Sequence, residues 1–328
     1  MKTQKLSLNR LQLILAGVLI LQILLAVVVN LPRRIEASGG PLLEGYDPAT
    51  TAEIWIENQS GDQLHIQKID GEWVIPEKGN YPIRAEKVAE LLEKVKGVQT
   101  NRMVTQTETS HSQLLVAEDD FMNKIILIDA NGNAHILFLG TSSGAGATHI
   151  RRSGHNQVFL TSDLTSWEVS PAISSWIDTA YLNLNQDQIQ SINVQNSNGA
   201  FNFTKGTDGQ WVFDALEDGE EFDVNAFQNM IGSVVSLQML EPLGMEERPS
   251  WGFDESVAAV SFVIQDESQS SKQVTLNIGR LLGSDYAVKA SNSPYYVKVS
   301  PTYISSLLEM DHSNLLVAEP TPTPESEP

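Results

Sequence analysis

The stretch GTSSGAGATHIRRSGH, residues 140–155, gathers residue types that could bind a ligand. Glycines beside hydroxyls are typical of a phosphate-binding loop, and the pair His149 and His155 is a candidate for a metal site. A phosphate-binding loop must lead into a helix, whose amides converge on the anion, and it usually ends in Gly-Lys-Ser/Thr. Here the following residues alternate like strands and that ending is missing, which argues against a phosphate site.

The metal interpretation of the same segment is also weak. Ser153-Gly154 predicts a turn between the two histidines, and no carboxylate lies at ligand spacing within the segment. Arg151 and Arg152 alternate faces on a predicted strand, so they cannot clamp one anion together. We therefore predict a flexible loop and a hairpin with exposed histidines.

The other polar clusters lack the spacing of a catalytic or metal site. The acidic residues 217–223, EDGEEFD, do not follow a calcium-loop pattern, and they precede a helix whose N-terminus favours negative charge. AEDD, residues 117–120, is interpreted in the same way. Neither G-x-S-x-G nor H-E-x-x-H occurs. We predict no catalytic, cofactor-binding or metal-binding residues and no enzymatic activity, with a hydrolase as the alternative.

The elements that carry these residues occur twice in the chain. Residues 53–75, EIWIENQSGDQLHIQKIDGEWVI, align with residues 191–213, SINVQNSNGAFNFTKGTDGQWVF, at a constant offset of 138. Each block predicts three strands joined by glycine turns. The second strands are out of phase, so one of the first turns must be a residue shorter. Trp73 and Trp211 recur at the same place and are interpreted as core anchors.

A helix and a hairpin follow each block. The apolar stripe of the first helix is Val88, Leu91, Leu92, Val95 and Val98, and that of the second is Phe227, Met230, Ile231, Val234 and Leu237. The hairpins, residues 124–140 and 258–279, both end in glycine. None of the six histidines (His65, His111, His135, His149, His155, His312) recurs in the other block. A duplicated catalytic site would have left such a pair.

These patterns predict an α+β fold of two tandem related modules, residues 51–180 and 181–316. Each is expected to be a mainly antiparallel β-sheet with one main helix packed on it. Residues 32–50 are expected to be a linker, and residues 317–328 a disordered Pro/Glu/Thr tail, because they contain too little apolar surface to form a core.

The N-terminal residues predict a membrane anchor. Residues 11–31 carry no charge, and as a helix they extend about 31 Å, close to the thickness of the hydrocarbon core. Lys2, Lys5 and Arg10 precede this span. The apolar run predicts a single-pass transmembrane helix within residues 1–31. The positive charges before it predict that the N-terminus is cytoplasmic and that the bulk of the chain lies outside the cytoplasm. A cleaved signal peptide is the alternative.

Composition excludes two further classes of function. The 328-residue chain has 21 Lys and Arg against 41 Asp and Glu, a formal charge of −20, which would repel nucleic acid. Cysteine is absent, which excludes thiol catalysis and disulfides.

Several segments together resemble the bacterial "domain of unknown function 4340" family: DGEWVI, YPIRAEKV, LFLG and HIRRSGHNQVFL. The resemblance covers residues 51–180 and, less closely, 189–310. The sequence departs from the family pattern at two places. Arg84 stands at the helix start, where a capping residue is usual, and LLV, residues 114–116, stands where the family has Tyr-Gly-Leu. In the second block WGF, residues 251–253, stands at that place. The resemblance implies an anchored extracytoplasmic protein, sometimes encoded beside transporter components of the gliding-motility type, and it transfers no catalytic residues.

The expected function is that of a membrane-anchored extracytoplasmic binding or scaffolding protein of the cell envelope. Its expected partners are the membrane, through residues 11–31, and other envelope subunits, such as those of an ABC-type transport system in which it would be an accessory component. The alternative is a solute-binding or glycan-binding protein that uses a surface between the two modules.

Overall fold

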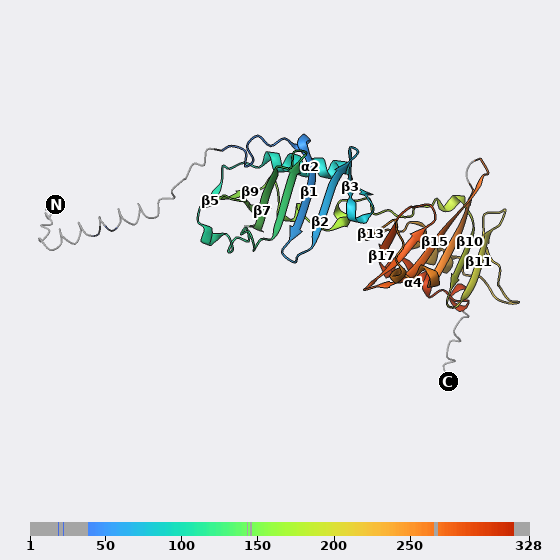
Figure 1. Cartoon of the computed structure of the whole chain (residues 1–328). Coiled ribbons are helices and arrows are strands. Elements are labelled where there is room, and N and C mark those ends of the chain that lie inside the picture. The colour runs from blue at the N-terminus through green and yellow to red at the C-terminus, as the bar shows by residue number, and fades with distance from the viewer. Residues whose placement is uncertain are drawn as a thin grey trace, which may run out of the picture.

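Two antiparallel β-sheets, one after the other along the chain, form the structure (Figure 1). This computed structural model describes residues 19, 22, 39–142, 144, 146–265 and 268–317. The sheets follow one another along the long axis of an elongated molecule, with β5 at one end and β11 near the other (Figure 1).

The first sheet has the strand order β4-β3-β2-β1-β6-β7-β8-β9-β5. Its strands are β1 (Thr51–Asn58), β2 (Gln63–Ile69), β3 (Glu72–Ile75), β4 (Tyr81–Pro82), β5 (Met103–Thr105), β6 (Asn123–Asp129), β7 (Ala134–Ser142), β8 (Thr148–Arg152) and β9 (Val158–Thr161).

The second sheet has the strand order β12-β11-β10-β14-β15-β16-β17-β13. Its strands are β10 (Ile189–Asn196), β11 (Gly199–Lys205), β12 (Trp211–Phe213), β13 (Glu241–Gly244), β14 (Ala258–Gln265), β15 (Ser271–Leu282), β16 (Asp285–Ala290) and β17 (Tyr296–Val299).

The two strand orders correspond, apart from β4, once β1 is matched with β10. The irregularities correspond as well. The β7/β8 register shifts between Leu139 and Ser142, and the β15/β16 register shifts between Ile278 and Leu281, 139 residues further on. The shorter turn predicted for one copy is confirmed, because Ile56 faces Leu64 whereas Val194 faces Phe201. The inward face of the second strand is thereby kept.

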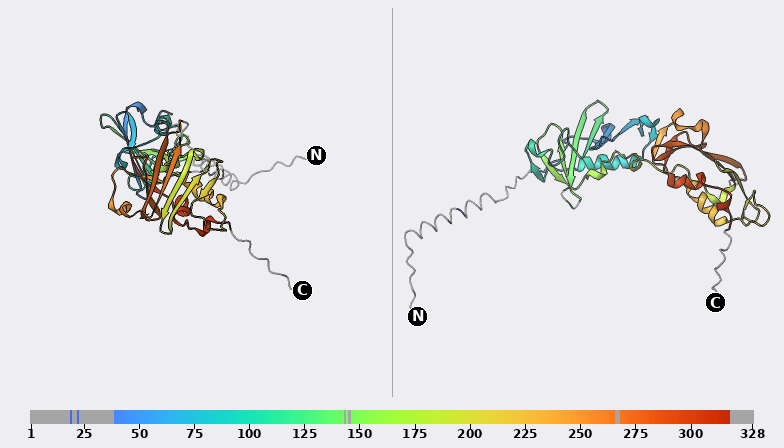
Figure 2. Two further views of the ribbon diagram at one scale, coloured as in Figure 1. Left: turned by 90° about the vertical axis from the view of Figure 1, so that its right-hand side faces the viewer. Right: turned by 90° about the horizontal axis from the view of Figure 1, so that it is seen from below.

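Helices cover one face of each sheet (Figure 2). Helix α2 (Ala85–Gly97) buries its predicted apolar stripe against the first sheet. Helices α3 (Val224–Val235) and α4 (Pro301–Leu308) pack on each other, with the Ser306 hydroxyl donating to the Met230 carbonyl at 2.9 Å. Asp223 caps α3 by accepting from two backbone amides, whereas Arg84 forms no side-chain cap for α2, as its sequence predicts.

A glycine closes the hairpin in each sheet because a loop carbonyl passes over it. A Cβ at Gly140 would lie 1.9 Å from the Leu114 carbonyl oxygen, and a Cβ at Gly279 would lie 2.2 Å from the Trp251 carbonyl oxygen. Real Cβ contacts are never this short. The requirement is therefore steric, and it occurs at the same place in both sheets.

The predicted fold class is wrong. The described residues form mostly antiparallel sheet, with three α-helices of 13, 12 and 8 residues among those described in full. The second sheet carries two helices rather than one, because Ser300 and Pro301 give residues 301–308 a helix start of their own. Across the described part of the chain, no helix has both the length and the apolar character needed to cross a membrane. The predicted span, residues 11–31, lies outside the described residues except for Leu19 and Gln22.

Part of the predicted linker, residues 32–50, packs onto the first sheet. Leu42, Leu43 and Tyr46 are buried in its core. The Leu42 amide donates to the Val98 carbonyl at 2.8 Å. This packing holds the chain from Gly39 onward against the end of α2.

Replacing either hairpin glycine should destabilise the fold strongly. We expect Gly140→Ala and Gly279→Ala each to lower the free energy of unfolding by about 2 kcal/mol or more, because the added methyl must displace a backbone carbonyl. Urea denaturation measures this. Gly232→Ala is the matched control, since nothing lies within 4 Å of its Cβ position in α3, and we expect a gain of up to about 1 kcal/mol. Equal effects at the three positions would contradict the steric account.

Candidate functional site

The two sheets meet end to end. The junction between them, here called the seam, combines ion pairs, hydrogen bonds and buried apolar contacts. The 3-10 helix η2 (Pro76–Lys78), which follows β3 of the first sheet, lies against β13 of the second. The Lys78 ammonium lies 2.9 Å from a Glu241 carboxylate oxygen. The Tyr81 and Tyr295 rings meet edge to face at 4.6 Å, and the Tyr295 hydroxyl donates to the Asn80 carbonyl at 3.2 Å.

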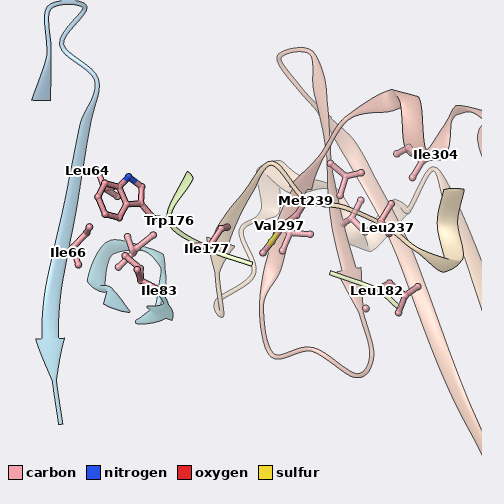
Figure 3. Close-up of a cluster of buried hydrophobic side chains, with 14 of the residues drawn as sticks. Leu64, Ile66, Ile83, Trp176, Ile177, Leu182, Leu237, Met239, Val297 and Ile304 are labelled. Carbon is pink, nitrogen blue, oxygen red and sulfur yellow. The ribbon is translucent and has the colours of Figure 1, made fainter. Parts of the chain in front are cut away.

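Buried apolar side chains run across the seam without interruption (Figure 3). Trp176 and Ile177, at the end of the first module, are 4% and 1% exposed. Trp176 lies beside Leu64 and Ile66 of β2, and Ile177 points towards Met239 and Val297 of the second module (Figure 3). One hydrophobic core therefore spans both sheets.

Backbone hydrogen bonds fix the segment that connects the sheets. The Tyr181 amide donates to the Leu237 carbonyl at 2.9 Å, and the Met239 amide donates to the Thr179 carbonyl at 2.8 Å. The Tyr181 hydroxyl donates to the Tyr295 carbonyl at 2.7 Å and accepts from the Ala290 amide at 2.8 Å. Burial raises the pKa of Tyr181, so this hydroxyl stays protonated and can keep both roles.

A hollow of about 450 Å³ opens on one side of the seam. Residues of both sheets and of the loop at 170–174 line it, and most of them are polar: Asn58, Asp62, Gln63, Ser170, Pro171, Ala172, Ile173, Ser174, Leu240, Glu241, Asp285 and Lys298. Its volume lies in the range of small-molecule sites, but its lining is more polar than such sites usually are.

Glu241 is the charged centre of this hollow. Its two oxygens bind Lys78 at 2.9 Å and Lys298 at 2.5 Å, so one carboxylate binds a cation from each of the two modules. Burial alone would raise the pKa of Glu241, but the hydrogen bonds from Lys298 and Lys78 outweigh it and the pKa is lowered. The carboxylate is therefore ionised at neutral pH and neutralised by its partners.

A second, smaller hollow of about 240 Å³ lies against α2 and shares Ser170 with the first. Trp176 forms part of its lining, and Trp167, which is 74% exposed, stands at its rim. Lys94 binds both Glu90, at 2.9 Å, and Glu168. The charges here are paired with one another, which leaves the exposed indole as the unusual feature.

The structure confirms part of the interpretation of residues 140–155 and corrects part of it. Strands β8 and β9 form the predicted hairpin, and His155 is exposed. His149 was predicted to be exposed but is buried, with only 8% of its surface accessible. Its Nδ1 lies 2.8 Å from the Thr141 carbonyl oxygen. Arg151 is also buried: it donates to the Val116 carbonyl at 2.6 Å and pairs with Glu118 at 3.1 Å. Its guanidinium lies over the Phe138 ring. This segment fastens the loop at 111–121 to the sheet.

The remaining candidate residues do not converge. Trp73 and Trp211 are half-buried and pack against the hydrophobic core, each under a lysine. His65 stacks on Trp55 at 4.0 Å, His111 is buried, and His312 pairs with Glu220 at 2.8 Å. Within the part of the chain that the structure describes, no group of three or more His, Asp or Glu could hold a metal ion. Nothing among these residues forms a nucleophile with its base.

Reasoning from the sequence missed the seam. Its charged residues, Lys78, Glu241 and Lys298, are far apart in the chain and belong to no motif. The one available signal was the difference between the blocks: YPIR stands before the first helix, whereas EEFD stands before the second. This difference lies at the edge of the first sheet that meets the second sheet.

One comparison with known proteins gives a match. The model of a family described as a domain of unknown function, DUF4340, matches residues 73–256, more than half of the chain. The match begins in β3 and ends beyond η8 (Phe253–Glu255), so it crosses the seam. Among curated proteins and solved structures, none matches the chain.

Replacing Glu241 should weaken the fold in a pH-dependent way. Because its pKa lies below the ordinary value of 4.5, its ion pairs stabilise the fold above about pH 4.5 and are lost as the pH falls through the lowered pKa. We expect Glu241→Gln to lower the free energy of unfolding by about 1–2 kcal/mol at neutral pH, leaving two half-buried lysines without a carboxylate. The difference from the unmodified chain should shrink below pH 4.5. A difference that stays constant with pH would contradict this role for Glu241.

Proposed function

We propose that this chain, which belongs to the DUF4340 family, is a non-catalytic binding or scaffolding protein of the cell envelope that works outside the cytoplasm. The observation that carries the proposal is the seam, where one hydrophobic core and a shared carboxylate hold two sheets in a fixed relation. A fixed pair of sheets presents surfaces at a set spacing, which is what a scaffold requires. The accessory role in an ABC-type transport system remains part of this proposal.

A duplicated module is the second part of the proposal. The matching strand orders and the recurring register shift in the hairpins support it. The segments that lead into the two sheets support it as well. The Leu42 amide donates to the Val98 carbonyl before the first sheet, and the Tyr181 amide donates to the Leu237 carbonyl before the second, with donor and acceptor both 139 residues further on. Duplication of one fold would produce a long surface. We propose that the functional contacts lie where the two copies differ in sequence.

The charge of the chain supports a protein partner over nucleic acid. Its formal charge of −20 would repel a polyanion, and the described acidic groups lie mostly in exposed turns and helix starts. Enzymatic activity is the less favoured proposal, since the seam residues neutralise one another and none is poised as a free acid or base.

A solute-binding or glycan-binding role is the second candidate function. The 450 Å³ hollow favours it, because its lining offers both donors, such as Asn58 and Lys298, and acceptors, such as Asp285. Its lining contains no aromatic residue, and an aromatic platform for a sugar ring is absent from this hollow. Because the hollow lacks such a platform, we favour scaffolding over glycan binding.

Photo-crosslinking in intact cells tests the proposal. A crosslinking residue at Ser174 or Asp285, both beside the seam, should capture the same envelope protein, whereas one at the exposed Asn131 in the β6/β7 turn should not. Capture of no envelope or transporter protein from either seam position would contradict the scaffold. Calorimetry distinguishes the second candidate: binding of envelope glycan fragments to the purified chain, weakened by Asp285→Ala, would favour the solute-binding role instead.

A further inference from the structure

The two outer ends of the molecule correspond to the two surfaces that meet at the seam. From this we infer that the chain associates head to tail with a second copy of itself, the β12 end of one chain docking on the β5 end of the next. The inference uses the correspondence between the halves that also supports the proposed function.

The seam is a contact between unlike surfaces. The first module contributes the edge with β3, β4 and η2, and the second contributes the edge with β13 and β17. Each module has both kinds of edge, so the β12 edge of the second and the β5 edge of the first are left over, at opposite ends of the elongated molecule (Figure 1). A contact of this kind can repeat from chain to chain and, unless it closes on itself, builds an open assembly.

The register identifies the residue at the β5 edge that takes the place of Glu241. Met103 faces Phe159 and Pro242 faces Val297, and both pairings are followed by the same register shift. Arg102 precedes Met103 as Glu241 precedes Pro242. The acid of the seam is thus replaced by a base at the free end.

The opposite replacement is found at the β12 edge. Residues 214–223 connect β12 to α3 as residues 76–84 connect β3 to α2, and where the first segment carries Lys78 the second carries the exposed acids Glu217, Asp218 and Glu221. At the seam the base, Lys78, lies on the edge beside β3 and the acid, Glu241, lies on β13. At the outer ends the signs are exchanged, because the acids lie beside β12, the counterpart of β3, and the base lies beside β5, the counterpart of β13. The charges remain complementary.

The charges at the outer ends have no partners of their own. The side chains of Arg102, Glu217 and Asp218 form no ion pair with any residue that the structure describes. At the equivalent positions of the seam, Lys78 and Glu241 pair with each other.

Apolar side chains are uncovered at the same two ends. Val104 of β5 is 45% exposed, and at the other end Val212 of β12 is 49% exposed and Leu216 is 37% exposed. Val74 of β3, the residue that corresponds to Val212, is only 5% exposed, and Pro82 of β4 pairs with it. The second sheet has no strand in the place of β4, so the equivalent position is open at the outer end of the molecule.

The association should be weaker than the seam. No connecting segment joins the two chains, and the net charge of −20 on each opposes their approach. A buffer of physiological ionic strength screens this long-range repulsion while leaving short-range contacts in place.

Sedimentation of the full chain over a range of concentrations tests the inference. We expect concentration-dependent growth beyond the monomer. Arg102→Glu and the double variant Glu217→Lys with Asp218→Lys should each weaken it about tenfold, since attraction is replaced by repulsion. An equimolar mixture of the two variants should restore association, because each then presents charges opposite to those of the other.

Lys96→Glu is the matched control for Arg102→Glu: it makes the same change in net charge at an exposed position on α2 and should leave association unchanged. A chain that stays monomeric, or association that Arg102→Glu does not weaken, would overturn the inference. Both results leave the seam within each chain intact, so they are distinct from a failure of the proposed scaffold, which would appear as the absence of a captured envelope partner.

Discussion

Everything in this molecule depends on how the chain passes from the first sheet to the second. Trp176 and Ile177 are buried at the end of one module, and Tyr181 and Leu182 enter the next through backbone hydrogen bonds to Leu237. Without this segment the sheets would be independent bodies joined by a tether. With it, a half-buried carboxylate, a tyrosine pair and a polar hollow lie in one place.

The constraints that recur in both halves concern the backbone, and the features that differ concern side chains at the edges. A carbonyl passes over Gly140 and over Gly279, and a register shift follows in both hairpins. By contrast, Glu241 at one edge corresponds to Arg102 at the other. Folding explains the first group, because any side chain at those glycines would clash. The second group is free to change with the neighbour that each edge meets.

Sequence reasoning recovered the features that depend on local pattern. The stripe of α2, the Asp223 cap and the shorter turn between β10 and β11 all follow from periodicity and turn chemistry. It failed where long-range contacts decide: His149 was expected to be exposed, yet Thr141 and the surrounding strands enclose it. The seam could not be predicted, since it joins residues more than 160 positions apart, such as Lys78 and Glu241. The helix count was wrong because α4 has only eight residues, and its start at Ser300 and Pro301 was not recognised.

The most direct test of the account is a distance measurement across the seam. The chain has no cysteine, so spin labels can be placed at the exposed Asn131 in the first sheet and Gln195 in the second without further changes. Pulsed electron paramagnetic resonance should give one narrow distance distribution, which broadens when Ile177→Asp places a charge in the shared core. A broad or two-peaked distribution in the otherwise unmodified chain would contradict the claim that the two sheets form one rigid body.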